Sequence, residues 1–248
     1  LIQEVSASLR TAGKDAKSFE GVLDGFASNV EHTDDIKSIG NLLGELLDAT
    51  RDMRSNTSGL QEHFEEKSRE IESLQEQLKA ERKRAMSDPL TGLFNRTALF
   101  ERIEEAVASA VDGETPSVIM FDIDHFKKIN DTHGHLIGDR VIRFVAQTLQ
   151  KNTKGQDTAA RFGGEEFTVL LPNTPSNGAV AVAQAIRKVI EDAKLVRADN
   201  KKPLGDITIS AGVSTYRPGE DVMDFMNRAD QALYRSKNEG RNRVSADG

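Results

Sequence analysis

The chain has 248 residues, of which 37% are hydrophobic and 29% are charged, and its formal net charge is −7. This length suffices for one large domain or two modest ones with a buried core. The acidic balance argues against a broad, sequence-independent grip on nucleic acid, which needs an excess of basic side chains. A local basic site for a phosphate ligand is compatible with it.

Cysteine usage and hydropathy limit the chain further. There is no cysteine, so disulfides and thiolate metal sites are excluded, and we expect a cytoplasmic protein. No apolar run reaches the length that spans a bilayer, and the first residues lack a signal-peptide pattern. Because the chain starts at Leu1 rather than at a methionine, an upstream sensor domain or membrane segment stays open.

The first 86 residues predict two long helices, because all six prolines follow residue 88. In the first helix, apolar positions alternate spacings of four and three, which is the heptad pattern of a coiled coil. These positions are Val5, Leu9, Ala12, Ala16, Phe19, Leu23, Phe26 and Val30. The stretch "HTDD" at residues 32–35 interrupts the pattern, with Thr33 or Asp34 available as the next N-cap.

A second heptad pattern runs without a slip to residue 85, even through the poor helix formers "SNTSG" at 55–59. Its positions are Ile36, Ile39, Leu43, Leu46, Thr50, Met53, Thr57, Leu60, Phe64, Lys67, Ile71, Leu74, Leu78, Glu81 and Ala85. Such a helix is about 75 Å long. We expect a helical hairpin, a four-helix bundle made by two hairpins, and a parallel coiled coil over residues 60–86. Lys67 and Glu81 weaken the coiled coil and can mark a choice of register or a switchable region. The alternative is a plain dimerisation stalk.

From residue 87 the pattern becomes that of an α/β (α+β) domain, with helices on one central mixed sheet. "SDPL" at 87–90 predicts a helix start, with Ser87 or Asp88 as the cap and Pro89 in the first turn. Strands are predicted at 117–124, 167–172 and 206–216, and helices at about 95–110, 135–152, 175–194 and 220–239. We therefore divide the chain into a stalk at residues 1–86 and a second domain at residues 87–248.

Acidic side chains gather at two predicted strand ends. Asp122 and Asp124 lie two apart, on one face of an apolar strand, where burial is costly unless a cation meets them. Oxygen ligands favour magnesium, which usually accompanies phosphates. The alternative is an ion pair with Lys127 or Lys128, and the strand alone favours neither.

The segment "RFGGEEF" at residues 161–167 predicts a tight hairpin through its Gly-Gly step. If its strands pair beside the strand of Asp122, Glu165 or Glu166 supplies a further carboxylate to that edge. Gly163 and Gly164 carry no side chain, so the turn can close against a ligand.

Four segments together resemble the GGDEF-domain family of diguanylate cyclases, in the order and spacing of that family. They are "DPLTGLFNR" (88–96), "FDIDHFKKINDTHGHLIGD" (121–139), "RFGGEEF" (161–167) and "ADQALYRSKNEGRNRV" (229–244). The resemblance covers about residues 87–245, excludes the stalk, and implies a fold like that of nucleotidyl cyclases. It is specific because four motifs fall in register.

The resemblance implies an enzyme that joins two GTP molecules into cyclic di-GMP and releases two pyrophosphates, with Mg²⁺ or Mn²⁺. Asp122, the carbonyl of Ile123 and Glu165 then hold the metal. Glu165 is also the family's candidate for helping to deprotonate the attacking 3′-hydroxyl. Glu166 is close enough to contribute, and the sequence leaves the division of roles between the two glutamates open.

The resemblance assigns the substrate contacts as well. Asn130 and Asp139 match the positions that read the guanine edge, and His135 lines the pocket or serves as a structural hydrogen-bonding group. The phosphate-binding positions are matched by Lys127, Lys237 and Arg241. Because each new bond needs the 3′-hydroxyl of a second GTP, two domains must face each other, and the stalk is expected to align a homodimer.

One family feature is altered. Many members carry an inhibitory product site, Arg-x-x-Asp, whereas this chain has "KGQD", with Lys154 in place of the arginine and Asp157 retained. Lysine lacks the planar fork of arginine, so we expect weak feedback inhibition. The alternatives to an active cyclase are a nucleotide receptor or scaffold with a degenerate site and a coiled-coil adaptor. The sequence leaves open whether the stalk responds to a regulatory protein, to an upstream sensor domain, or to nothing beyond constitutive dimerisation.

Overall fold

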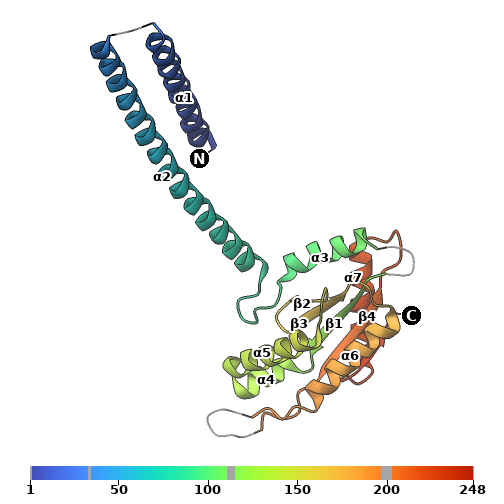
Figure 1. The fold of residues 1–248 in the computed structure, drawn as a ribbon. Coiled ribbons are helices and arrows are strands. Elements are labelled where there is room, and N and C mark those ends of the chain that lie inside the picture. Colours follow the sequence, from blue (N-terminus) through green and yellow to red (C-terminus); the bar gives the residue numbers. More distant parts are fainter. Residues whose placement is uncertain (1, 33–34, 111–114, 197–202, 248) are drawn as a thin grey trace. The chain divides into compact units, whose positions relative to one another are not determined.

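The computed structural model describes residues 2–32, 35–110, 115–196 and 203–247, and its contacts divide the chain into two units, Leu1–Glu81 and Arg82–Gly248 (Figure 1). Within the first unit, α1 (Ile2–Val30) runs antiparallel to the start of α2 (Ile36–Met86). Over the described residues, no helix has the length and apolarity needed to cross a membrane. The predicted caps Thr33 and Asp34 lie outside the described residues.

Asp35 caps α2. Its carboxylate accepts hydrogen bonds from the backbone N–H groups of Lys37 (3.3 Å) and Ser38 (3.1 Å), two of the donors that the first turn leaves unpaired. These bonds lower the pKa of Asp35, with the hydroxyl of Ser38 making the largest contribution. The cap therefore fixes the start of the second long helix.

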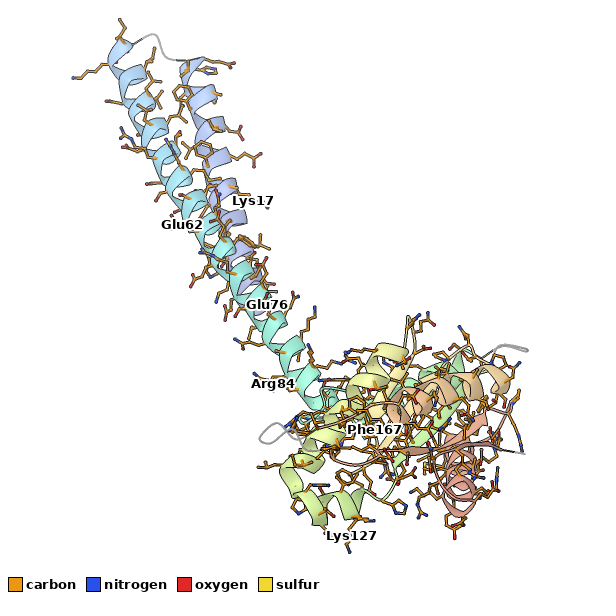
Figure 2. The ribbon with its side chains drawn as sticks, turned by 90° about the horizontal axis from the view of Figure 1, so that it is seen from below. Lys17, Glu62, Glu76, Arg84, Lys127 and Phe167 are labelled. Atoms are coloured by element: carbon orange, nitrogen blue, oxygen red, sulfur yellow. The ribbon has the colours of Figure 1, made fainter. Side chains whose placement is uncertain are left out.

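The heptad residues of the hairpin divide into two rows. Val5, Ala12, Phe19 and Phe26 are half-buried, together with Ser8, Asp15 and Val22 of the same helix. The predicted positions Leu9, Leu23 and Val30 are instead exposed, as are Ile36 and Leu43 of α2. The predicted pattern is thus correct in period, but only some of its described residues are shielded from solvent within the hairpin. Charged side chains such as Glu62 and Glu76 project from α2 (Figure 2).

The second unit is built on a five-stranded sheet with the order β2-β3-β1-β4-β5. The central strand β1 (Ser117–Ile123) pairs antiparallel with β3 (Glu166–Leu171) and β4 (Ile209–Thr215). At the edges, β2 (Thr158–Arg161) pairs antiparallel with β3, and β5 (Val244–Ala246) pairs parallel with β4. This mixed sheet with flanking helices confirms the α/β (α+β) prediction.

Helices cover both faces of the sheet. One face packs against α3 (Arg96–Ala108) and α7 (Val222–Asn238), and the other packs against α5 (His135–Asn152) and α6 (Ser176–Glu191). The first core includes Leu99, Ile103, Val118, Met120, Leu170, Phe225 and Leu233. The second core includes Ile119, Phe121, Val141, Val145, Leu149, Phe167, Val169, Ala183 and Ile186. Alternate residues of β1 thus enter opposite cores, and Phe167 lies inside the domain (Figure 2).

A glycine sets how closely α7 approaches the sheet. A Cβ at Gly212 of β4 would overlap the backbone of Ala229 and Leu233 in α7. The backbone-to-backbone contact therefore requires glycine at this position. It brings the C-terminal end of α7, which carries Lys237, beside the edge where β1 ends.

Three local features differ from the expectations. Residues 88–95 form a turn rather than a helix start, because Asp88 accepts bonds from the N–H (2.9 Å) and hydroxyl (2.7 Å) of Thr91. Asn95 is the cap of α3, accepting a bond from Ala98 N (3.0 Å). The short helix α4 (Phe126–His133) and the edge strand β5 were not predicted.

Candidate functional site

The predicted acidic edge is assembled where β1 and β3 meet. Asp122 lies opposite Glu166 in the antiparallel register, and the carbonyl of Glu165 accepts a bond from Ile123 N (3.3 Å). Asp122 is 6% exposed and forms an ion pair with Lys237, with Oδ2 2.8 Å from Nζ. The cation beside this carboxylate is therefore Lys237, and not Lys127 or Lys128.

Burial and like charge act together on the carboxyl groups of this edge. Burial raises the pKa of Asp122, and the ion pair with Lys237 only partly opposes that rise. Burial also raises the pKa of Glu165, with further contributions from the negative charges of Asp122 and Glu166. The structure therefore holds several carboxylates within electrostatic reach of one another, a placement that favours an additional cation.

The donor set suits a hard divalent ion. Asp122, Glu165 and the carbonyl of Ile123 offer oxygen only, the chemistry that Mg²⁺ and Mn²⁺ prefer over zinc. Among the described residues, no three His, Cys, Asp or Glu side chains are arranged as a metal site. The fit thus rests on two carboxylates and one carbonyl, which leaves coordination positions for phosphate oxygens.

Asp124 does not share the role of Asp122. Its buried carboxylate accepts bonds from the hydroxyls of Thr208 (2.7 Å) and Ser210 (2.6 Å) and from the backbone N–H of Asn242 (3.0 Å). These bonds tie the end of β1 to β4 and to the loop after α7. The alternation that puts Asp122 and Asp124 on one face was predicted correctly, but the sequence did not reveal the three partners of Asp124.

A hollow of about 490 Å³ lies beside the acidic edge and gathers most of the predicted substrate residues. Its lining consists of Phe126, Lys127, Asn130, Asp131, His135, Asp139, Ile142, Arg161, Gly164 and Glu165. Figure 2 shows Lys127 on α4 at the periphery of the domain. One concave surface thus combines the predicted guanine readers with a predicted catalytic glutamate.

Asn130 is held with an unused acceptor. Its Oδ1 is buried without a hydrogen-bond partner among the described residues, and a Cβ at Gly138 would overlap this atom. Buried polar atoms are nearly always paired in folded proteins, so an unpaired one at a hollow requires an explanation. The glycine makes room for the side chain, and the free acceptor is available to a donor on a bound ligand.

The predicted phosphate-binding cations are distributed around the same edge. Lys237 forms an ion pair with Asp122, whereas the exposed Arg241 acts on it electrostatically and, like Lys237, partly opposes the rise in the pKa of Asp122 that burial causes. Lys127 lines the hollow. These cations come from two helices and one loop that are far apart in the sequence, so only the fold brings them together.

The glycines of the hairpin differ in their surroundings. A Cβ at Gly163 would lie 2.6 Å from Glu166 Oε2, whereas a Cβ at Gly164 would meet no atom of the described residues within 4 Å. Neither the packing of the protein nor a positive φ requires glycine at 164, which lines the hollow. The guanidinium of Arg161 supports the turn by donating to the carbonyls of Gly163 (Nε, 3.1 Å) and Gly164 (Nη2, 2.7 Å). The sequence did not assign Arg161.

The predicted inhibitory segment forms a closed turn. Asp157 Oδ2 accepts a bond from Lys154 N (2.9 Å), and Asp157 N donates to the carbonyl of Lys154 (3.0 Å). The side chain of Lys154 is exposed. The retained aspartate thus stabilises its own loop.

Comparison with known proteins agrees with this geometry. The family described as "Diguanylate cyclase, GGDEF domain" matches residues 85–243. Diguanylate cyclase VdcA of Vibrio cholerae is 35% identical over 248 residues, which cover 98% of this chain and 72% of VdcA. Two further curated diguanylate cyclases are longer, and the chain spans 40% and 29% of their lengths.

Solved structures extend the similarity to the long helices. The coiled coil and GGDEF domain of DgcB from Caulobacter crescentus, in complex with c-di-GMP, matches with a TM-score of 0.71 and 39% identity, covering 75% of this chain and 98% of that one. Diguanylate cyclase SiaD from Pseudomonas aeruginosa, in complex with its activator SiaC, matches with a TM-score of 0.66 and 28% identity, covering 99% and 88%. The chain therefore belongs to the GGDEF family of diguanylate cyclases.

Proposed function

We propose that this diguanylate cyclase condenses two GTP molecules into cyclic di-GMP and two pyrophosphates, as a cytoplasmic homodimer aligned by its stalk. The observation that carries the proposal is the hollow in which Asn130, Asp139 and Glu165 meet, next to the acidic edge at Asp122. The base of GTP occupies the hollow and its phosphates extend toward Lys237 and Arg241.

The guanine edge is read by an amide and a carboxylate. Asp139 accepts hydrogen bonds from the ring and exocyclic N–H groups of guanine, and the unpaired Oδ1 of Asn130 accepts a further one. Adenine lacks the matching donors, so these two residues select GTP. His135 closes the same hollow from the start of α5.

The phosphoryl-transfer step depends on position and charge. Lys127, Lys237 and Arg241 bind the phosphate oxygens and orient the α-phosphorus for in-line attack by the 3′-hydroxyl of the GTP held by the partner. Glu165 accepts the proton of this hydroxyl, because its position in the lining of the hollow brings its carboxylate to the edge where the two substrates meet. Glu166, one residue further on, adds negative charge to the same edge.

Asp122, the carbonyl of Ile123 and Glu165 would hold Mg²⁺ or Mn²⁺. When bound, the ion stabilises the negative charge that develops on the phosphate oxygens. Lys237 neutralises Asp122 in the free protein and lies where it can turn to a phosphate when substrate arrives.

The stalk, residues 1–86, is proposed as the dimerisation and regulatory domain, and residues 87–248 as the catalytic domain. No described residue of α2 is buried, although this helix has 51 residues. Long helices depend on tertiary packing for stability, so its apolar rows need a partner. Beyond the hairpin, the heptad continues with Ile71, Leu74 and Leu78, all exposed. A parallel second copy of α2 covers this row and sets the two catalytic domains side by side.

The hairpin also exposes apolar side chains on both of its helices. Leu9, Leu23 and Val30 form one stripe along α1, and Ile36 and Leu43 form another along α2. Each stripe is offset from its helix's half-buried row in the same rotational sense, so an antiparallel pair presents both on one side. Two such faces make a four-helix bundle. Since SiaD, which matches over the whole chain, is known in complex with its activator SiaC, we also propose that a protein bound to the stalk can regulate this dimer.

Incubation of the full chain with GTP and Mg²⁺, followed by chromatography of the nucleotides, tests the proposal. We expect cyclic di-GMP and pyrophosphate, and no product from the variant Glu165→Gln. Binding of GTP without product indicates a receptor, and neither binding nor product indicates an adaptor. Either outcome would refute the proposed activity.

The dimer is tested separately by light scattering of Leu74→Glu, with Gln75→Glu as the control on the same turn. We expect the first substitution to lower both dimer content and specific activity, and the second to change neither. Full activity of a monomeric Leu74→Glu protein would contradict the role assigned to the stalk.

A further inference from the structure

The loop after α7 has an unusual backbone. Gly240, Arg241 and Asn242 all have positive φ angles, of 115°, 62° and 47°. Glycine adopts positive φ angles freely and asparagine tolerates them, whereas they are unfavourable for arginine. A run of three such residues persists only where other contacts fix it. Arg241 therefore has a backbone conformation that is unfavourable for arginine.

Asn242 ties this loop to two other elements through three hydrogen bonds. Its backbone N–H donates to Asp124 Oδ2 at the end of β1 (3.0 Å). Its side-chain Oδ1 accepts a bond from Arg187 Nη1 (2.8 Å), and its Nδ2 donates to Glu191 Oε1 (2.6 Å), both in α6. The backbone N–H, the side-chain oxygen and the side-chain nitrogen of Asn242 thus each take part in a bond to another element.

The α6 side of this arrangement is itself fixed. Arg187 Nη1 also pairs with Glu191 Oε2 (3.1 Å), so the two partners of Asn242 bind each other. Hydrogen bonds lower the pKa of Glu191 to about 2. The bond from Asn242 contributes most, followed by those from Lys188 and Arg187. A carboxylate that is charged across the physiological range is a dependable acceptor for the amide.

The residue before Asn242 is Arg241, one of the predicted phosphate-binding cations. Arg241 is exposed, and its charge is felt by Asp122 at the acidic edge. Its backbone N–H donates to the carbonyl of Ser236 (3.0 Å), which holds the start of the turn to α7. Asn242 holds the other end of the turn, so the direction of the Arg241 side chain is set by its neighbour.

We propose that Asn242 is a positioning residue, which locks the left-handed turn between β1 and α6 so that Arg241 points to the triphosphate of GTP. The inference rests on the proposed function for the identity of the ligand. Asn242 does not touch the substrate. It acts through Arg241, because its side-chain bonds stabilise the turn in which Arg241 has a positive φ angle.

A double-mutant cycle tests this role. Asn242→Gly keeps access to positive φ and removes both side-chain bonds, and Arg241→Ala removes the guanidinium. Affinity for a non-hydrolysable GTP analogue, KM and kcat are measured for both single variants and the double variant. Asn238→Ala, at the exposed end of α7, is the matched control.

We expect Asn242→Gly to weaken analogue binding and raise KM by about tenfold in the natural background, since small misplacements of a binding group have large effects. In the Arg241→Ala background the same change should alter binding by less than about twofold. Asn242→Asp tolerates positive φ but faces the carboxylate of Glu191, so it should also weaken binding.

An equal loss from Asn242→Gly in both backgrounds, or no loss in the natural one, would overturn the inference. This outcome can be distinguished from failure of the proposed function. A chain that yields no cyclic di-GMP can still show that the effect of Asn242→Gly on analogue binding depends on Arg241. Thermal unfolding of each variant separates local repositioning, with Tm nearly unchanged, from loss of the fold.

Discussion

Arg161 in β2 and Asp88, two residues after α2, form an ion pair with 3.1 Å between Nη1 and Oδ2. Both side chains are largely buried, with 16% and 15% exposed. The same guanidinium donates to the carbonyls of Gly163 and Gly164 in the signature hairpin. One side chain thus connects the segment that enters the catalytic domain with the turn that borders the substrate hollow.

Removing this connection should affect both stability and catalysis. Arg161→Ala removes the cation paired with Asp88, whose carboxylate then keeps its bonds from Thr91, and it removes the donor of two carbonyls. We expect a loss of about 3 kcal/mol in the free energy of unfolding. We also expect a lower kcat at saturating GTP, because the hairpin that carries Glu165 loses its support. Urea unfolding and steady-state kinetics measure the two effects. Arg143→Ala, on the exposed side of α5, should change neither, and a stable, fully active Arg161→Ala protein would contradict the role.

The sequence predicted most of the regular elements of the catalytic domain, because their apolar periodicities are long. It missed α4 and β5, since eight and three residues are too few for a periodic signal. The turn at 88–95 was mistaken for a helix start, since Asp88 followed by proline is also typical of an N-cap. Its pairing with Arg161 joins residues 73 positions apart, which no local pattern encodes.

Those parts of the site were predictable that follow from the alternation of side chains along a strand and from the sequence motifs. Asp122 and the hairpin acids were placed at one edge correctly, because β1 and β3 pair as expected. The partner of Asp122 was not foreseen, since Lys237 reaches it only through the close contact of α7 with Gly212. The roles of Asp124 and Asn242 depend on long-range bonds of the same kind.

Glu191 gives the fold a defined acid sensitivity. Because its pKa is lowered to about 2 by Asn242, Lys188 and Arg187, its contribution to stability is present above the unfolded value of roughly 4.3. It is lost as the pH falls from there through about 2. Unfolding free energies at pH 5, 4 and 3 should therefore decline less steeply in Glu191→Gln than in the natural protein. Glu101→Gln, an exposed control in α3, should keep the natural slope, and equal slopes in all three proteins would refute the assignment.

Gly164→Ala should separate substrate binding from folding. A Cβ at this position meets no protein atom within 4 Å, and its φ is not positive, so we expect stability within about 0.5 kcal/mol of the natural protein. The methyl group instead occupies space that the triphosphate needs beside the hairpin, so KM for GTP should rise at least tenfold. Thermal unfolding and kinetics test both parts. An unchanged KM would show that the phosphates do not approach this turn.

Gly138→Ala tests indirectly the guanine-binding role that we propose for Asn130. The added methyl group would overlap Asn130 Oδ1, so the asparagine must move out of its place in the hollow. We expect overpacking to cost about 1–3 kcal/mol of stability, and discrimination between GTP and ATP to fall. Competition binding with the two nucleotides measures the discrimination. A second variant, Asn130→Ala, lacks the overlapping atom, and combining it with Gly138→Ala should restore stability but not discrimination.

We predict that Lys154 weakens feedback inhibition by the product. The Asp157 carboxylate is engaged with Lys154 N within its own turn, and the exposed lysine side chain lacks the planar fork that grips phosphate and guanine edges. Titration of cyclic di-GMP into the assay should therefore inhibit the natural protein only weakly. Lys154→Arg should strengthen the inhibition about tenfold, and adding Asp157→Ala should remove that gain, whereas Lys151→Arg should have no effect. The prediction is contradicted if cyclic di-GMP inhibits the natural protein strongly and non-competitively and if Asp157→Ala abolishes this inhibition. Lysine would then suffice at position 154, and product binding would not require the planar guanidinium of arginine.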